Sequence, residues 1–445
     1  MDFNFDEFWK AVKSWPSTPS FLVILIFESG VFKYLWPSSQ EDNFFYALVV
    51  IILVTYFVWK SYRKFPKKRK GSFGFLVSIY CDDSSIDKKF REDFIKTLKT
   101  DLKGRKSGEK IDFIELKKHI SEKVNDKDEA LNVLNKCNCD FLIYGRVRTR
   151  EEGGEKIHFL DINCAAQHTP IPDIVSNRFA QEMGEVLPNK IRIEDSKFLE
   201  SFEITSKLVE TSSKYLIGHI KFLAHDFNAA LEFYNEVLSK LTVPEKPDVT
   251  ANTLRSRCYE SITVVYETKI FLANKNWVDT HSDIYLEEVN ELIGEYDCYS
   301  LTSTNIDRVR AIFLVFEQKD FVAARVILDK TLSSRRDALW FLNSAFLHAC
   351  DGNLKNAVIN YRKAKERPSE LFGNNLLGDV ENFIVVFIER HPDFSRLHYC
   401  LGFINKELKE DSILARQHFS AFLECTSEAE FTKERELATR WIINI

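Results

Sequence analysis

A short polar segment after the first strand-like run is the natural place to look for a bound ligand. It follows the apolar residues 74–80 and includes Asp82, Asp83, Ser84 and Ser85. In sheets of this kind ligands tend to bind beyond the carboxyl ends of parallel strands, where the N–H groups at the start of a following helix would help to hold them. Two adjacent carboxylates would repel a phosphate unless a metal ion lay between them. The alternative is a helix cap within a solvated turn.

The sequence contains no recognisable catalytic or cofactor motif. The polar segment 104–108 has the residue types of a phosphate-binding loop at the wrong spacing, and G-x-G-x-x-G, H-E-x-x-H and G-x-S-x-G do not occur. Cys137 and Cys139 are too close for the usual zinc knuckle, and no histidine has a second His or Cys at metal-ligand spacing. Nine scattered cysteines are typical of reduced, buried thiols. We therefore predict no enzymatic activity, catalytic residue, cofactor or metal.

Length and composition are those of a globular chain with several parts. The 445 residues correspond to about three domains. The chain has 37 phenylalanines but only 15 glycines and 11 prolines, which favours long, tightly packed helices. Its net charge of −5 gives no overall attraction for nucleic acid, so we expect no nucleic-acid partner.

Two apolar segments near the amino terminus predict a membrane anchor. Residues 44–59 form a 16-residue run without a charge, close to the shortest length of a spanning helix. Residues 17–36 are less apolar because they include Glu28 and Lys33. Three interpretations of this first segment stay open: a spanning helix whose Glu28 faces a partner helix, a re-entrant or interfacial segment, and an ordinary amphipathic helix. The short link between the segments favours a transmembrane helical hairpin over 17–59.

A basic cluster follows the second apolar segment. It comprises Lys60, Arg63, Lys64, Lys67, Lys68, Arg69 and Lys70. The positive-inside rule places these cations on the cytoplasmic side, where they could bind anionic lipid head groups. We interpret 60–72 as a basic juxtamembrane linker and 1–16 as an amphipathic interfacial helix. These features predict a two-pass protein of a bacterial inner membrane, with membrane lipids as partners and most of the chain in the cytoplasm.

The period of the apolar residues changes after residue 71 and predicts a small α/β domain over 73–190. Apolar runs typical of strands occur at 74–80, 111–116, 140–147 and 156–165. Helical patterns separate the first three runs and a turn separates the last two, so the order is β-α-β-α-β-β. This order favours a mixed sheet with helices packed against it. The pattern resembles the amino-terminal domain of TolB-like proteins, and residues 140–163 are similar to their strand, hairpin and strand element.

Residues 194–445 read as helices joined by short polar turns, with a repeated motif. The sequence D-F-x-A-A begins at Asp226 and again at Asp320, and related copies surround Ala357 and Ala415. The interval from Ala324 to Ala357 is 33 residues, close to one tetratricopeptide repeat (TPR). The spacing of small and aromatic residues resembles the TPR family at Gly218, Ala230 and Tyr234, at Ala345, Ala357, Tyr361 and Ala364, and at Gly402, Ala415 and Phe419.

The TPR resemblance implies a helical solenoid that binds peptides or proteins on its concave face. On the family's pattern, the first helix of each pair lines this groove. The corresponding positions include Tyr215, His219, Phe222, Phe313, Phe316, Leu342 and Phe346. Two alternatives stay open: these side chains form the core, or they form a self-association surface of a homo-oligomer.

The predicted fold class is an α+β membrane-anchored multidomain protein, with an N-terminal transmembrane helical hairpin, a small mixed α/β domain and a C-terminal all-α TPR-like solenoid over 194–445. Two functions fit this organisation. In the first, a membrane-anchored adaptor or scaffold binds a partner protein through its solenoid. In the second, a ligand or partner triggers a membrane effector, as in bacterial stress or phage defence, whose amino-terminal helices oligomerise and perturb the bilayer. Glu28 distinguishes the two functions. In a passive anchor a central carboxylate makes membrane insertion less favourable, whereas in an effector it could line a pore. We expect the adaptor.

Overall fold

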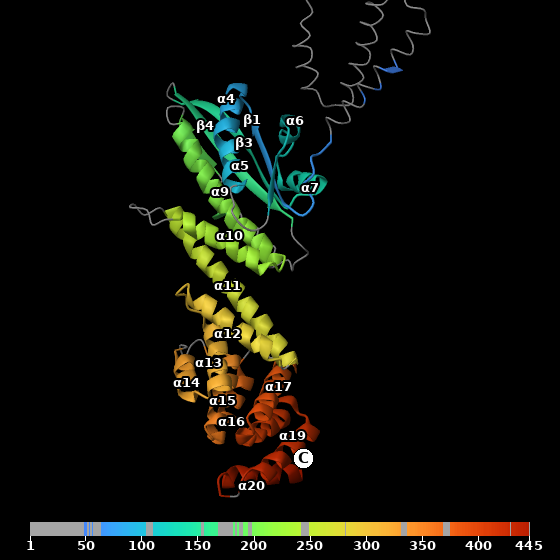
Figure 1. Ribbon diagram of the computed structural model, residues 1–445, viewed down its shortest axis with the longest axis vertical. Helices are drawn as coiled ribbons and strands as arrows, with labels where there is room; N and C mark the ends of the chain where they lie inside the picture. Colours follow the sequence, from blue (N-terminus) through green and yellow to red (C-terminus); the bar gives the residue numbers. More distant parts are fainter. Residues whose placement is uncertain are drawn as a thin grey trace, which may run out of the picture. The chain divides into compact units, whose positions relative to one another are not determined.

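The computed structural model divides the chain into two compact units (Figure 1). Unit 1 comprises Met1–Cys258 and unit 2 comprises Tyr259–Ile445, so the boundary falls within helix α11 (Val249–Thr280). The structure describes residues 49–50, 53, 56, 64–103, 110–152, 155–167, 181–182, 185–186, 190–194, 198–241, 249–280, 282–330, 336–367, 374–427 and 429–444.

The predicted membrane anchor requires a correction. Nowhere in these described ranges is a helix both long enough and apolar enough to cross a bilayer. This finding contradicts the membrane-anchored fold class, the transmembrane hairpin over 17–59 and the two-pass membrane location. The physical reason is length and charge: a helix of 16 uncharged residues spans only about 24 Å of a hydrocarbon core about 30 Å thick. The other segment carries Glu28, which is costly in lipid. Residues 1–48, including Glu28 and the proposed interfacial helix, lie outside the described residues.

Unit 1 contains a five-stranded sheet in the order β2-β1-β3-β4-β5. Its strands are β1 (Phe73–Cys81), β2 (Ile111–Glu115), β3 (Phe141–Glu152), β4 (Glu155–Ala166) and β5 (Lys190–Glu194). β1 pairs in parallel with β2 and β3, whereas the β3–β4 and β4–β5 pairs are antiparallel. The sheet is therefore mixed, as the sequence predicts, and β5 is an addition to the four expected strands.

The residues of β1 are buried in succession rather than alternately, which indicates that helices cover both faces of this sheet. Besides the amino-terminal part of α11, the described helices of unit 1 include α4 (Ser84–Phe90), the π-helix η1 (Arg91–Ile95), α5 (Lys96–Lys103), α6 (Lys118–Ser121), α7 (Lys127–Cys137), α9 (Phe198–Leu223) and α10 (Phe227–Lys240). Leu76 and Leu142 pack with Leu134 of α7. The Phe75 and Phe141 rings, 5.4 Å apart between centroids, belong to the opposite face. Figure 1 shows α6 and α7 on one side of the strands and α5 and α9 on the other.

Local chemistry sets the ends of α7, which packs on this sheet. The Asp126 side chain accepts a hydrogen bond from the N–H of Glu129 at 2.8 Å. The Glu129 carboxylate in turn accepts from the N–H of Asn125 at 3.0 Å, which completes a reciprocal cap. At the other end, Asn138 has a φ of 52° in the left-handed region and terminates the helix.

Unit 2 consists of helices, of which several consecutive pairs pack together, such as α13 with α14, α15 with α16, and α18 with α19. Besides the carboxyl-terminal part of α11, the helices are α12 (Asp283–Asp297), α13 (Thr304–Gln318), α14 (Phe321–Asp329), α15 (Ala338–Cys350), α16 (Leu354–Glu366), α17 (Asn374–Arg390), the 3₁₀-helix η4 (Pro392–Leu397), α18 (His398–Phe403), the π-helix η5 (Ile404–Lys409), α19 (Ser412–Cys425) and α20 (Thr432–Asn444). The pairs bury a continuous apolar core that extends from α11 to α20.

The repeated D-F-x-A-A motif starts the second helix of a pair. The side chains of Asp226 and Asp320 accept hydrogen bonds from the N–H groups three residues later, at 3.3 and 2.9 Å. Each aspartate is therefore an N-cap, which satisfies a donor that the helix itself leaves free. The last alanine of each motif, Ala230 or Ala324, is fully buried, so the neighbouring helix can approach closely.

Two glycines bring aromatic rings against the partner helix of a pair. A Cβ atom added to Gly218 of α9 would lie 2.7 Å from the Tyr234 ring of α10. One added to Gly402 of α18 would lie 2.5 Å from the Phe419 ring of α19. These distances are shorter than any ordinary carbon contact. The small and aromatic residues noted in the sequence therefore make direct contacts within the two helix pairs.

Candidate functional site

A groove in unit 2 is the candidate functional site. It has a cavity volume of about 480 Å³ and lies between α11, α13, α15 and α17, which are alternate helices of the chain. Its apolar lining consists of Ile270, Phe271, Val278, Ile306, Val309, Ile312, Leu339, Leu342, Phe346, Val380, Phe383 and Ile384. Along each helix these residues recur every three or four positions, so each helix contributes one face.

The lining changes from buried to exposed between the floor and the rim. The side chains of Ile384, Leu342 and Phe346 are almost fully buried, whereas Phe271 is 63% exposed. A large exposed aromatic side chain beside an apolar cavity is typical of a surface that receives another apolar group. The floor is therefore preformed, and the rim has area left to bury.

Arg308 is a buried cation in this lining, with only 6% of its surface exposed. One of its terminal nitrogens, Nη1, lies 2.9 Å from Oδ2 of Asp337. The other carboxylate oxygen of Asp337 caps α15 by accepting from the N–H of Trp340 at 2.9 Å. The Nε–H of Arg308 is also buried, but no acceptor for it exists in the described part of the chain. Because a buried donor without an acceptor is unfavourable, this guanidinium is suited to donate a hydrogen bond to a ligand oxygen.

Amide and carboxylate groups complete the polar part of the groove. Glu267 accepts from the Ser303 hydroxyl and from Nδ2 of Asn305, the latter at 3.2 Å. Asn274 and Asn343 also line the groove, and the structure assigns their side-chain amides no hydrogen bond within its described residues. An asparagine amide offers both a donor and an acceptor, which is the pair of groups that binds an extended peptide backbone.

Two of the predicted groove residues, Leu342 and Phe346, line this cavity. Phe316 packs instead against Trp277, at 4.7 Å between ring centroids, and Phe313 lies against the unit 2 core. The other three belong to α9 of unit 1. Tyr215 is buried there, His219 lies 2.9 Å from Glu182 through Nε2, and Phe222 contacts Phe227 at 5.8 Å between ring centroids.

The predicted ligand loop is occupied by local contacts. Asp82 accepts hydrogen bonds from Arg146 at 2.6 and 2.9 Å, and the backbone carbonyl of Asp83 accepts from the N–H of Asp87 at 3.0 Å. Ser84 and Ser85 start helix α4. The Arg146 contacts both go to Oδ1 of Asp82, so this carboxylate forms an exposed ion pair across the loop.

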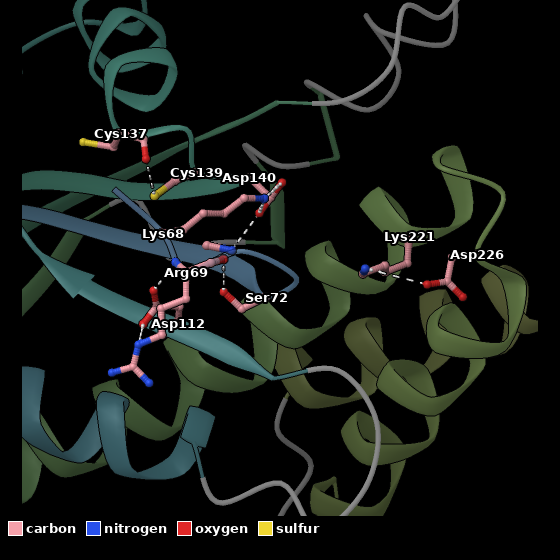
Figure 2. Close-up of polar contacts among 10 residues, drawn as sticks. Lys68, Arg69, Ser72, Asp112, Cys137, Cys139, Asp140, Lys221 and Asp226 are labelled. Carbon is pink, nitrogen blue, oxygen red and sulfur yellow. Dashed lines mark hydrogen bonds and ion pairs between the residues drawn. The ribbon is translucent and has the colours of Figure 1, made fainter. Parts of the chain in front are cut away.

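Part of the predicted head-group cluster binds unit 1 itself, at the start of β1 (Figure 2). Nζ of Lys68 lies 2.6 Å from Asp140, which also accepts from the N–H of Gly74 at the same distance. The N–H of Arg69 donates to Asp112 at 2.8 Å. Lys64, Lys67 and Lys70 are exposed, and Lys60 and Arg63 lie outside the described residues.

Sequence reasoning missed Phe271, Asn274 and Arg308. A stripe of residues spaced by three or four positions is visible on α11 and α13, but the same spacing describes a stripe that packs into the core. The signal that separates the two is an arginine within the apolar sequence of α13, since a buried cation requires specific partners.

No described residues form a group of three or more His, Cys, Asp or Glu side chains that could hold a metal ion. In comparisons with known proteins, no family model, no curated protein and no solved structure matches this chain.

Proposed function

We propose that this chain is a non-enzymatic adaptor that binds an apolar segment of a partner protein in the groove of unit 2. The segment carries a carboxylate that meets Arg308. The TPR-like interpretation is part of this proposal, because it assigns partner binding to the first helix of each pair.

The observation that carries the proposal is the convergence of four helix faces on one cavity with an unsatisfied arginine. The apolar lining supplies affinity, since burial of apolar surface contributes about 25 cal/mol per Å². The Nε–H of Arg308 supplies selectivity for an oxygen acceptor. A carboxylate fits better than a neutral carbonyl, because it would add charge compensation to a cation whose ion-pair partner Asp337 is half exposed.

The test selects peptides from a displayed random library on the full-length chain. We expect the enriched peptides to combine several apolar residues with one Asp, Glu or terminal carboxylate. Phe271→Asp places a charge on the apolar rim and should weaken binding of these peptides about tenfold or more. Val322→Asp is the matched control, because Val322 is 77% exposed on α14 and does not line the groove.

Arg308→Lys tests the carboxylate separately, since lysine keeps the charge but loses the planar fork. The variant should reduce the affinity of a selected peptide more than that of its analogue with Asn in place of Asp. Peptides without an acidic group, or peptides that bind Phe271→Asp as tightly as the wild type, would contradict the proposal. Circular dichroism establishes that each variant is folded.

A further inference from the structure

A second cavity in unit 2 lies on a different face of α15. It has a volume of about 240 Å³ and is lined by α14, α15, α16 and the residue Arg336. It shares no lining residue with the groove. Its contribution from α15 includes Ser344 and His348, whereas the groove uses Leu342 and Phe346. An inference about this cavity therefore does not depend on the proposed groove.

The charged groups around this cavity are mainly positive. Arg325, Arg336 and Lys363 line it together with a single carboxylate, Asp329, so three positive charges minus one leave an excess of two. Asp351 pairs with Arg325 from outside the lining, which reduces the excess to one. Lys363 has no ion-pair partner within the described ranges. Cations from two helices, α14 and α16, and from Arg336 just before α15 surround the cavity and favour a bound anion.

Arg336 provides an unsatisfied donor at the same place. Its guanidinium lies 4.1 Å from the centroid of the Trp340 ring, which holds the group in a defined orientation. Oδ1 of Asp329 is 3.8 Å from Nη2 of Arg336, beyond hydrogen-bond distance. The Nε–H is buried, and no acceptor for it occurs among the residues that the structure describes. A ligand oxygen would satisfy this donor.

We propose that this cavity binds a phosphoryl group, either as free phosphate or as a phosphate monoester. Two guanidinium groups, one ammonium group and the Ser344 hydroxyl offer more donors than the two oxygens of a carboxylate can use, even though Arg325 also pairs with Asp351. A phosphoryl group has three acceptor oxygens and close to two negative charges at neutral pH, which matches an arginine cluster.

The pKa of His348 reports whether an anion occupies this cavity. Burial lowers the pKa of its imidazole, and the positive charge of Arg325 lowers that pKa further, whereas Asp351 and Asp329 act in the opposite direction. An anion beside Arg325 would offset its positive charge, so the pKa of His348 should rise when the site is filled.

The experiment measures the pKa of His348 by NMR in the full-length chain, with the resonance assigned by comparison with His348→Gln. Inorganic phosphate and O-phosphoserine are the probes, and chloride at equal ionic strength is the reference. We expect phosphate to raise the pKa of His348. A matching rise with O-phosphoserine shows that the site accepts a phosphate monoester, and a rise with phosphate alone restricts the site to the free ion.

Lys363→Gln removes an exposed cation from the cavity, so it should leave the fold intact and weaken phosphate binding about tenfold. Lys355→Gln, which removes another exposed lysine of α16 outside the cavity, should bind as the wild type does. Arg336→Lys keeps the charge without the Nε–H and should also weaken binding. No change in the pKa of His348 with either probe, or an equal response in Lys363→Gln and the wild type, would overturn the proposal.

Discussion

The carboxylate of Glu381 in α17 should contribute a large and pH-dependent part of the stability of unit 2. Its side chain is 12% exposed. It accepts a hydrogen bond from Nδ2 of Asn405 at 2.6 Å and pairs with Lys409. Nε2 of His418 lies 3.8 Å from the same carboxylate. These partners come from η5 and α19, so the cluster holds three elements together.

His418, Lys409 and Asn405 lower the pKa of the Glu381 carboxyl group from 4.5 to about 2, although burial opposes them. Because the pKa is lower in the folded state, this group stabilises the fold at pH values above 4.5. The contribution is lost as the pH falls through the folded-state value of about 2. The difference between the two pKa values corresponds to about 3 kcal/mol at neutral pH. Solvent around the partly exposed Lys409 reduces this to about 2 kcal/mol.

Glu381→Gln keeps the shape and removes the charge, so it should lower the free energy of unfolding of unit 2 by about 2 kcal/mol at neutral pH. The difference from the wild type should shrink between pH values of about 5 and 2 and then vanish. Urea unfolding can be followed by ¹⁹F NMR of fluorotryptophan, in which Trp441 reports on unit 2. This probe is needed because a chain with two units need not unfold in one step.

Glu389→Gln is the matched control, since Glu389 is exposed on the same helix. Its effect should stay below about 0.5 kcal/mol at every pH. The reasoning fails if the two variants have equal stability at neutral pH. It also fails if the loss in Glu381→Gln is the same at neutral and acidic pH.

Two further predictions concern packing and thiol exposure. Gly402→Ala should destabilise unit 2, because overlap of the new Cβ with the Phe419 ring costs about 1–3 kcal/mol and exceeds the helix-propensity gain of about 1 kcal/mol. Gly294→Ala in α12 has no heavy atom within 4 Å of the new Cβ and should stabilise unit 2 instead. Changes in melting temperature of the same sign for the two variants would contradict the packing argument. Cys298 and Cys425 are exposed, whereas burial raises the pKa of several other thiols. Iodoacetamide should therefore modify these two first in the native protein, and mass spectrometry that finds rapid labelling of the buried thiols would refute this order.

Local sequence patterns were sufficient to predict most strands and helices. The strands β1 to β4 are short apolar runs bounded by polar turns, and their parallel and antiparallel pairing follows from the helices and the hairpin that connect them. The caps at Asp226 and Asp320 could be read from the D-F-x-A-A motif, since capping depends on three neighbouring residues. β5 was missed because Lys190–Glu194 alternates charged and apolar residues over only five positions.

The membrane interpretation shows where local reasoning fails. It relied on the hydropathy of residues 17–59, although an uncharged run at the lower limit of length is also compatible with other environments. The described helices include none that could cross a bilayer.

The sequence by itself determined the strands β1 to β4, the capping residues and the small residues at helix contacts, because each depends on neighbours within a few positions. Only the tertiary structure decided which apolar stripes face the core and which face the groove. Leu342 and Phe316 occupy similar helical patterns, yet one lines the cavity and the other packs against Trp277. The environments of Arg308 and Glu381 could not be predicted from the sequence either, since Asp337 lies 29 positions from Arg308 and Lys409 lies 28 positions from Glu381. Burial and charge pairing across such separations arise only when the helices pack.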